Sequence, residues 1–390
     1  MKHWRFLLVL LVIVVAPLFA SKGFALSLLS RIGIMALFAL SYNMLLGETG
    51  LLSFGHAVYY GLGSFATLHV LNGLSARGLP APVTLLPLAG GLAALLFGLV
   101  FGYPTTRRAG TTFAMISLGI GEMVAASSLM FPAFFGGEAG ISGNRVTGKG
   151  LFGIDYGTPL QVYYLIAFWV VVCAIAIRAL SGTPLGRLAN AVRDNPLRVE
   201  FVGYNPTRVR YLMVVLAGFF AGVAGGLNAL RAEIVTAEAL SDYTSGIVIL
   251  MAFTGGIGRF YGPILGAVVV TVLQVAVASV TPAWPFYFGL FFVLIVLYAP
   301  GGIASLLERR WQPRTLALAA GPALLLLFGI IGAVEMAYAR SSDTGDARLR
   351  IVGIPLDGES RLSWVFVAAA VAAGIVLLKR VRREPAVGLQ

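Results

Sequence analysis

Few side chains in this sequence are of the types that do acid–base, nucleophilic or metal chemistry, and those few do not cluster. The 390 residues include three histidines and one cysteine, Cys173, which lies inside an apolar run. A catalytic or metal site needs several such groups at a spacing that brings them together. A membrane-embedded enzyme is therefore disfavoured, and we predict no cofactor and no metal.

Two isolated polar residues nevertheless invite a functional interpretation. Glu122 falls near the middle of an apolar run, and an ionisable side chain at the bilayer centre costs roughly 2.5–3.5 kcal/mol on insertion scales. We therefore expect Glu122 to face the interior of a helical bundle, in a structural pair or in a functional contact. His56 is interpreted as a hydrogen-bonded packing residue rather than a proton relay.

One stretch nearly matches a nucleotide-binding motif. The segment GNRVTGKG, residues 143–150, follows G-x-x-x-x-G-K-[ST] except at its last place, where Gly150 has no hydroxyl for Mg²⁺. We interpret the segment as a flexible glycine-rich loop and predict that the chain has no ATPase site of its own.

Glycines recur at helical spacing and in two interrupted stretches, 47–65 and 253–268. Faces of small residues let membrane helices approach closely, and a pair of interrupted helices in two halves of a transporter points to a substrate path. Packing alone also explains these glycines. The candidates for the path or for helix packing are Gly50, Ser53, Gly55, His56, Gly61, Gly63, Glu122, Gly218, Gly222, Gly255, Gly256, Gly258 and Gly262.

A basic segment near the middle of the chain, residues 186–210, contains five arginines. Residues 184–200 fit an amphipathic helix, with Pro196 as a possible break. We predict that its apolar side fills a groove on a cytoplasmic partner while charges orient it at the rim; the alternative is a topology signal only. The candidate coupling residues are Leu185, Gly186, Arg187, Leu188, Val192, Arg193, Asp194, Glu200 and Gly203.

The elements that position these residues are membrane helices. The chain is 58% hydrophobic and only 11% charged, whereas soluble domains carry about 25% charged residues. Apolar runs long enough to span a bilayer recur along the sequence. They predict an all-α polytopic membrane protein of about 10–12 transmembrane helices, some broken at glycines. The expected spans are 6–20, 26–46, 51–71, 81–101, 112–130, 160–180, 210–230, 244–256, 262–280, 286–303, 315–337 and 363–378.

The net charge of +12 is what positively charged cytoplasmic loops produce, and it predicts a lipid bilayer rather than nucleic acid as the surroundings. The distribution of Lys and Arg predicts both termini in the cytoplasm and loops 131–159 and 338–362 outside. No clean A-x-A cleavage site precedes Ser21 and many spans follow, so we expect an uncleaved first helix. We expect a core over residues 1–312, with a cytoplasmic loop at about 181–209. Residues 313–390 are expected to form an appended helical hairpin and a basic cytoplasmic tail.

Several blocks resemble one family. The sequence GRLANAVRDNPLRVEFVGYNPTRVRYLMVVLAGFFAGVAGGL resembles the coupling-loop region of LivM-type permease subunits of branched-chain amino-acid ABC importers. SYNMLLGETGLLSFGHAVYYGLGSFA resembles their early glycine-rich helix, and RRAGTTFAMISLGIGEM resembles the segment that carries the fifth-helix glutamate. GGIGRFYGPILGAV and FGLFFVLIVLYAPGGIASL resemble the closing blocks. The matches cover about residues 30–310.

The resemblance implies a permease subunit in the cell inner membrane, paired with a second, LivH-like permease subunit. Two cytoplasmic ATPase subunits would receive the coupling segment, and a periplasmic binding protein would deliver the substrate. Arg198 and Glu200 stand where small apolar residues are frequent in the family, which resembles a subset that includes urea-type permeases. The alternatives are therefore a urea, amide or aromatic-acid ABC permease, or a secondary transporter.

Overall fold

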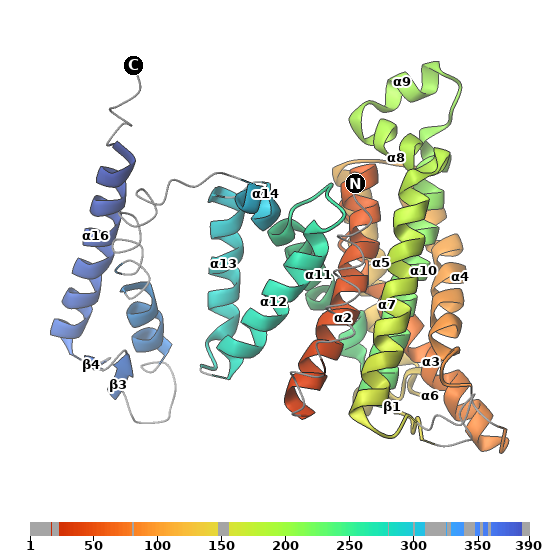
Figure 1. The fold of residues 1–390 in the computed structure, drawn as a ribbon, viewed down its shortest axis with the longest axis horizontal. Helices are drawn as coiled ribbons and strands as arrows, with labels where there is room; N and C mark the ends of the chain where they lie inside the picture. The colour runs from red at the N-terminus through yellow and green to blue at the C-terminus, as the bar shows by residue number, and fades with distance from the viewer. Residues whose placement is uncertain are drawn as a thin grey trace. The chain divides into compact units, whose positions relative to one another are not determined.

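The computed structural model describes residues 17, 23–79, 82–146, 156–279, 281–298, 301–308, 325, 329–338, 348–351, 354–357 and 360–383. These residues form mainly helices, with two short antiparallel strand pairs (Figure 1). The chain divides into two compact units. One comprises Met1–Val275 and Phe291–Leu306, and the other comprises Ala276–Leu290 and Leu307–Gln390.

Five helical segments in the described part of the chain are long and apolar enough to cross a membrane. They are Gly23–Glu48, made of α2 (Gly23–Asn43) and the π-helical turn η1 (Met44–Glu48), then α4 (Leu86–Thr106), α5 (Thr111–Met130), α7 (Pro159–Gly182) and α10 (Pro206–Ala232). The all-α class is confirmed. Most of the predicted spans 6–20 and 315–337 lies outside the described residues, and the predicted count of 10–12 spans stays a prediction.

Helix α3 (Ala57–Ala76) begins later than the predicted span 51–71. The residues between η1 and α3 form no regular helix, because Gly50 adopts a left-handed φ of +69°, which L side chains rarely take. The first glycine-rich stretch is therefore a broken helix, as its composition predicts.

Helix α10 is the centre of the first unit. It packs against α2, α3 and α4, and most of its length is buried. The crossings are close because glycines face each other and leave no room for a side chain. A Cβ on Gly63 would lie only 2.5 Å from Cα of Gly222, and a Cβ on Gly90 only 2.8 Å from the Gly222 carbonyl oxygen. Close backbone approach of this kind maximises van der Waals contact where lipid provides no hydrophobic drive.

Shorter elements complete the first unit. A strand pair joins β1 (Ile141–Ser142) to β2 (Ile234–Val235), with Ile141 opposite Val235. The remaining elements are α6 (Pro132–Phe135), η2 (Gly137–Ala139), α8 (Pro184–Asp194), α9 (Pro196–Phe201), η4 (Ala237–Leu240), α11 (Asp242–Gly255), α12 (Gly262–Ala278), α13 (Trp284–Tyr298) and α14 (Gly302–Glu308). Of these, α12, α13 and α14 also contribute residues to the second unit.

The second unit contains α16 (Arg361–Arg383) and an antiparallel pair, β3 (Arg348–Ile351) with β4 (Ile354–Asp357). The sequence left residues 338–362 undecided between short helix and coil, and a strand pair was not expected there. Backbone pairing between two neighbouring segments supplies hydrogen bonds that the polar composition of this stretch does not reveal. Met336 and Val367 form a small buried cluster with Ala333 and Trp364 packed against it.

Candidate functional site

The basic segment forms two helices, α8 and α9, beyond the ends of α7 and α10 (Figure 1). The helix expected over 184–200 is broken at Pro196, the residue named as its possible break, because the chain turns at Asn195, whose backbone is extended. Asn195 Oδ1 accepts a hydrogen bond from Arg198 N at 3.1 Å, and Pro196 takes the first helical position. The same cap followed by proline starts α8 at Thr183–Pro184 and α10 at Asn205–Pro206, so the sequence itself sets the break.

The apolar side of α8 lies against its own chain. Ala189 and Val192 are 0% and 1% exposed, and Gly186 is buried where α8 turns back on the end of α7. Leu185 and Leu188 are half-buried. The expectation that Val192 fills a partner's groove is therefore corrected. An amphipathic helix buries its apolar stripe on whatever surface covers it, and here this chain supplies that surface.

The exposed apolar surface belongs to α9 and the turn that follows it, and the sequence analysis did not single it out. Phe201, Val202 and Leu197 are 89%, 74% and 64% exposed. Gly203, with φ +90°, ends α9, and Gly203 N donates to the Glu200 carbonyl oxygen at 2.8 Å. A groove of about 310 Å³ runs between α8 and α9, lined by Leu188, Ala191, Asp194, Asn195, Arg198, Val199, Val202 and Tyr204.

Arg193 points toward the membrane helices rather than toward a rim. Its Nη1 donates to the Gly47 carbonyl oxygen in η1, and its Nε donates to Asp194 Oδ1 at 3.0 Å. Its stem covers Gly50, where an added Cβ would lie 3.0 Å from Arg193 Cγ. Arg187 and Glu200 are exposed. Arg193 therefore connects α8 directly to the first broken helix.

The second glycine-rich stretch meets the first one at the same place. Asn43 Oδ1 accepts a hydrogen bond from Gly258 N at 3.3 Å. A Cβ on Gly47 would lie 3.0 Å from Gly258 N, and Gly258 has a φ of +80°. The structure thus brings Gly47 and Gly258 together beside Arg193, although about 210 residues separate them in the sequence.

The end of α11 packs closely on its neighbours. Gly255 and Gly256 contact Gly262 and Gly301 so tightly that a Cβ on Gly256 would lie 2.6 Å from the Gly301 carbonyl oxygen. Gly256 also has a φ of +113°. Only glycine combines that conformation with so close an approach.

The candidates of the first glycine-rich stretch lie in a packed interior. His56 is fully buried, forms a hydrogen bond between Nε2 and Ser41 Oγ at 2.9 Å, and is ringed by Phe38, Tyr42 and Tyr59. Ser53 is buried. The glycines of this stretch sit at close contacts: Gly55 on Ser117, Gly61 on Leu240 and Gly63 on Gly222. The candidate Gly218 of α10 packs on Tyr59 of the adjoining helix α3.

Glu122 does not face the interior of its own bundle, which corrects the sequence expectation. Gly121 is buried, whereas Glu122 and Met123 are exposed on α5. Helical periodicity places neighbouring residues on different sides, and only the packing of α5 decides which side is covered.

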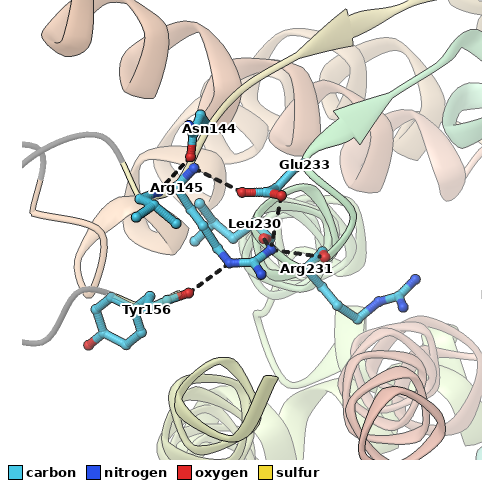
Figure 2. A network of polar contacts seen from close by, with 7 residues as sticks. Asn144, Arg145, Tyr156, Leu230, Arg231 and Glu233 are labelled. Carbon is cyan, nitrogen blue, oxygen red and sulfur yellow. Dashed lines mark hydrogen bonds and ion pairs between the residues drawn. The ribbon is translucent and has the colours of Figure 1, made fainter. Parts of the chain in front are cut away.

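A second polar network lies at the opposite end of α10 (Figure 2). Arg145 donates to the carbonyl oxygens of Tyr156 at 2.9 Å, Leu230 at 3.1 Å and Arg231 at 3.3 Å. It also pairs with Glu233 at 3.5 Å. The carbonyls of Leu230 and Arg231 belong to the last turn of α10 and lack partners within the helix. Arg145 was not among the predicted site residues, because residues 143–150 were interpreted as a flexible loop.

The long apolar helices, the glycine-lined crossings and the amphipathic α8–α9 segment define a polytopic membrane protein of the transporter class. The family described as the permease component of branched-chain amino acid transport systems matches residues 24–300. The chain belongs to this family.

Individual proteins that are similar to this chain carry names that agree with the family assignment. The chain is 30% identical over 324 residues to the high-affinity branched-chain amino acid transport system permease protein LivM of Salmonella typhimurium, covering 77% of this chain and 75% of that protein. It is 29% identical over 324 residues to LivM of Escherichia coli, with the same coverage. The LivH permease protein of E. coli is 25% identical over 263 residues, 61% of this chain and 80% of that protein. No solved structure matches the chain significantly.

Proposed function

We propose that the chain is the LivM-like permease subunit of an ABC importer that moves branched-chain amino acids across the inner membrane. In this proposal a LivH-like permease subunit completes the translocation path, a periplasmic protein delivers the amino acid, and two cytoplasmic ATPase subunits drive transport. Both termini and the α8–α9 segment are cytoplasmic. The family and the names of the relatives support the proposal.

The arrangement of α8 and α9 is the observation that carries the proposal. One side of the segment is fixed to the permease by Ala189 and Val192. The other side presents Leu197, Phe201 and Val202 to solvent next to an open groove. Large exposed apolar side chains beside a groove are typical of a docking surface for another protein. We assign that partner as the ATPase subunit.

Arg193 gives the motion of α8 a route into the membrane. Its hydrogen bond to Gly47 and the contact of Gly47 with Gly258 join α8 to both glycine-rich stretches. These stretches contain left-handed glycines rather than continuous helix, so they can change backbone angles without unwinding a long helix. A displacement of α8 by the ATPase would therefore act first on the two broken stretches.

The test uses the chain assembled with its ATPase and permease partners and reconstituted with the binding protein. The double variant Leu197→Ala, Phe201→Ala should reduce ATPase co-purification and leucine-stimulated ATP hydrolysis at least tenfold. Central apolar anchors of an interface commonly contribute about 2 kcal/mol or more each, and about 1.4 kcal/mol is a tenfold change in affinity. Phe168→Ala, an exposed residue on α7, is the matched control and should have no such effect.

Normal stimulated hydrolysis and uptake in the double variant would contradict the docking surface. Leucine uptake that resists vanadate but collapses with an uncoupler would instead identify a secondary transporter. Saturable uptake of urea or an aromatic acid without leucine uptake would replace the proposed substrate.

A further inference from the structure

One face of α5 is exposed along its whole length and carries an acid at its middle. Met115, Gly119, Glu122, Met123 and Ala126 lie on this face, at the spacing of successive helical turns. Within the described part of the chain, no residue forms a hydrogen bond or ion pair with the Glu122 carboxylate. Glu122 is the twelfth of the 20 residues of α5, so it lies deep in the span.

The exposed face of α7 is of a different kind. Its residues Leu160, Tyr164, Phe168, Val172 and Ile175 are 39–54% exposed, and all have large apolar or aromatic side chains. Such a face suits lipid. A mid-span carboxylate does not, because hydrocarbon offers it neither water nor a partner charge, and ionisable residues in spans usually face protein or a water-filled cavity. Lipid is therefore not the expected cover of the α5 face.

The side of α5 next to this face packs on the first broken stretch. Phe54 N donates to Ser117 Oγ at 3.1 Å, and a Cβ on Gly55 would lie 3.5 Å from Gly121 N. Glu122 directly follows that contact. Irregular backbone at membrane depth is tolerated where it is buried in protein or beside a watery cavity. The unpartnered acid and the broken helix thus occur together at one level of the bundle.

We propose that this face of α5 lines the solute path and that the Glu122 carboxylate binds the ammonium group of an amino-acid solute in transit. The inference rests on the proposed function, because a zwitterionic amino acid presents a cation to such an acid. Gly119 and Ala126 leave room for the solute on either side of Glu122. Met115 and Met123 give the walls a flexible apolar surface that adapts to branched side chains.

Cysteine labelling tests the path. The chain has one cysteine, Cys173, which is buried, so Cys173→Ala supplies the background. Single cysteines at Gly119, Glu122 and Ala126, with matched controls at Tyr164, Phe168 and Val172, are exposed to a water-soluble methanethiosulfonate in the reconstituted importer. We expect the α5 cysteines to react at least tenfold faster than the α7 cysteines. Turnover with leucine-loaded binding protein should slow labelling severalfold at positions 119 and 126, where Glu122 is retained.

Labelling no faster on α5 than on α7 would overturn the path assignment. If the α5 cysteine variants were not labelled and no longer co-purified with the partner permease, the face would be a protein interface. That result would also overturn the path assignment. Because labelling is read independently of uptake, a reactive α5 face in an importer that does not carry leucine would refute the proposed substrate alone.

The charge is tested separately. Glu122→Gln should lower leucine uptake at least tenfold at unchanged membrane abundance, while Glu122→Asp should retain at least a third of the parent uptake. Parental uptake in the Gln variant would overturn the ammonium contact.

Discussion

Arg145 and Arg193 lie at opposite ends of α10, a helix of 27 residues and therefore about 40 Å long. Both donate to backbone carbonyls of other elements. Arg145 is 14% exposed and pairs with Glu233 besides three carbonyl oxygens. Arg193 is 35% exposed, and among the described residues it has one hydrogen bond outside its own helix, to Gly47.

The difference shows how one side chain type serves two purposes. Arg145 closes the end of α10 and holds the nearby loop, because several acceptors surround a largely buried cation. Arg193 makes a single link that a moderate displacement can break, since its other partner, Asp194, is 68% exposed. We infer that one end of α10 is fixed and that the other is able to rearrange, which fits entry of ATP-driven motion at α8.

The largest effect is expected at the fixed end. Arg145→Met removes the donor that satisfies the last carbonyls of α10 and leaves Glu233 without its pair. Hydrogen bonds to charged groups contribute about 1.5–3 kcal/mol each, so the variant should lose at least about 2 kcal/mol of stability. Thermal unfolding in detergent and the yield of monodisperse protein measure it.

The control for Arg145 is Arg77→Met, because Arg77 is exposed at the end of α3. It should leave both the yield and the unfolding temperature unchanged. If Arg145→Met behaved like this control, the end of α10 would not be fixed by Arg145 and the contrast between the two ends would disappear.

A smaller effect on stability but a clear effect on transport is expected at the other end. Arg193→Met keeps apolar cover over Gly50 and removes the hydrogen bond to Gly47. The partly exposed bond should contribute only about 1 kcal/mol to stability. Leucine uptake should nevertheless fall about tenfold at normal ATPase co-purification, because α8 would no longer move the broken stretch.

Arg187→Met is the matched control for this prediction, since Arg187 lies on the same helix and is exposed. Equal uptake in the two variants would show that Arg193 does not transmit motion. Loss of ATPase co-purification in Arg193→Met would instead return Arg193 to the rim of the docking surface.

The smallest effect is expected for Asp194→Asn. Exposed ion pairs contribute about 0–1 kcal/mol, and the amide oxygen of Asn can still accept from Arg193 Nε. Uptake should stay within twofold of the parent in a direct comparison at low and high salt. A larger loss of uptake at low salt would mean that the ion pair with Asp194 holds Arg193 in place. The hydrogen bond between Arg193 and Gly47 would then be less free to rearrange than we infer.

The sequence alone determined the class of fold and the main breaks in the helices. Apolar runs of bilayer length predict the described spans within a few residues, because lipid requires every backbone group to be paired within a helix. Gly50 and the caps followed by proline at 183–184, 195–196 and 205–206 mark turns by local chemistry. The family resemblance also rested on the sequence alone, and the family match over residues 24–300 confirms it.

Only the tertiary structure decided which way the decisive side chains point. A helical period defines an apolar side of α8 but not what covers it, so Val192 and Arg193 were assigned to a partner although they contact this chain. Helical periodicity likewise does not determine which side of α5 is covered, so it could not show that Glu122 is exposed. Arg145 escaped notice because its acceptors are backbone carbonyls of residues 156, 230 and 231. Carbonyl groups exist at every position of a chain, and only folding selects the few that meet a guanidinium.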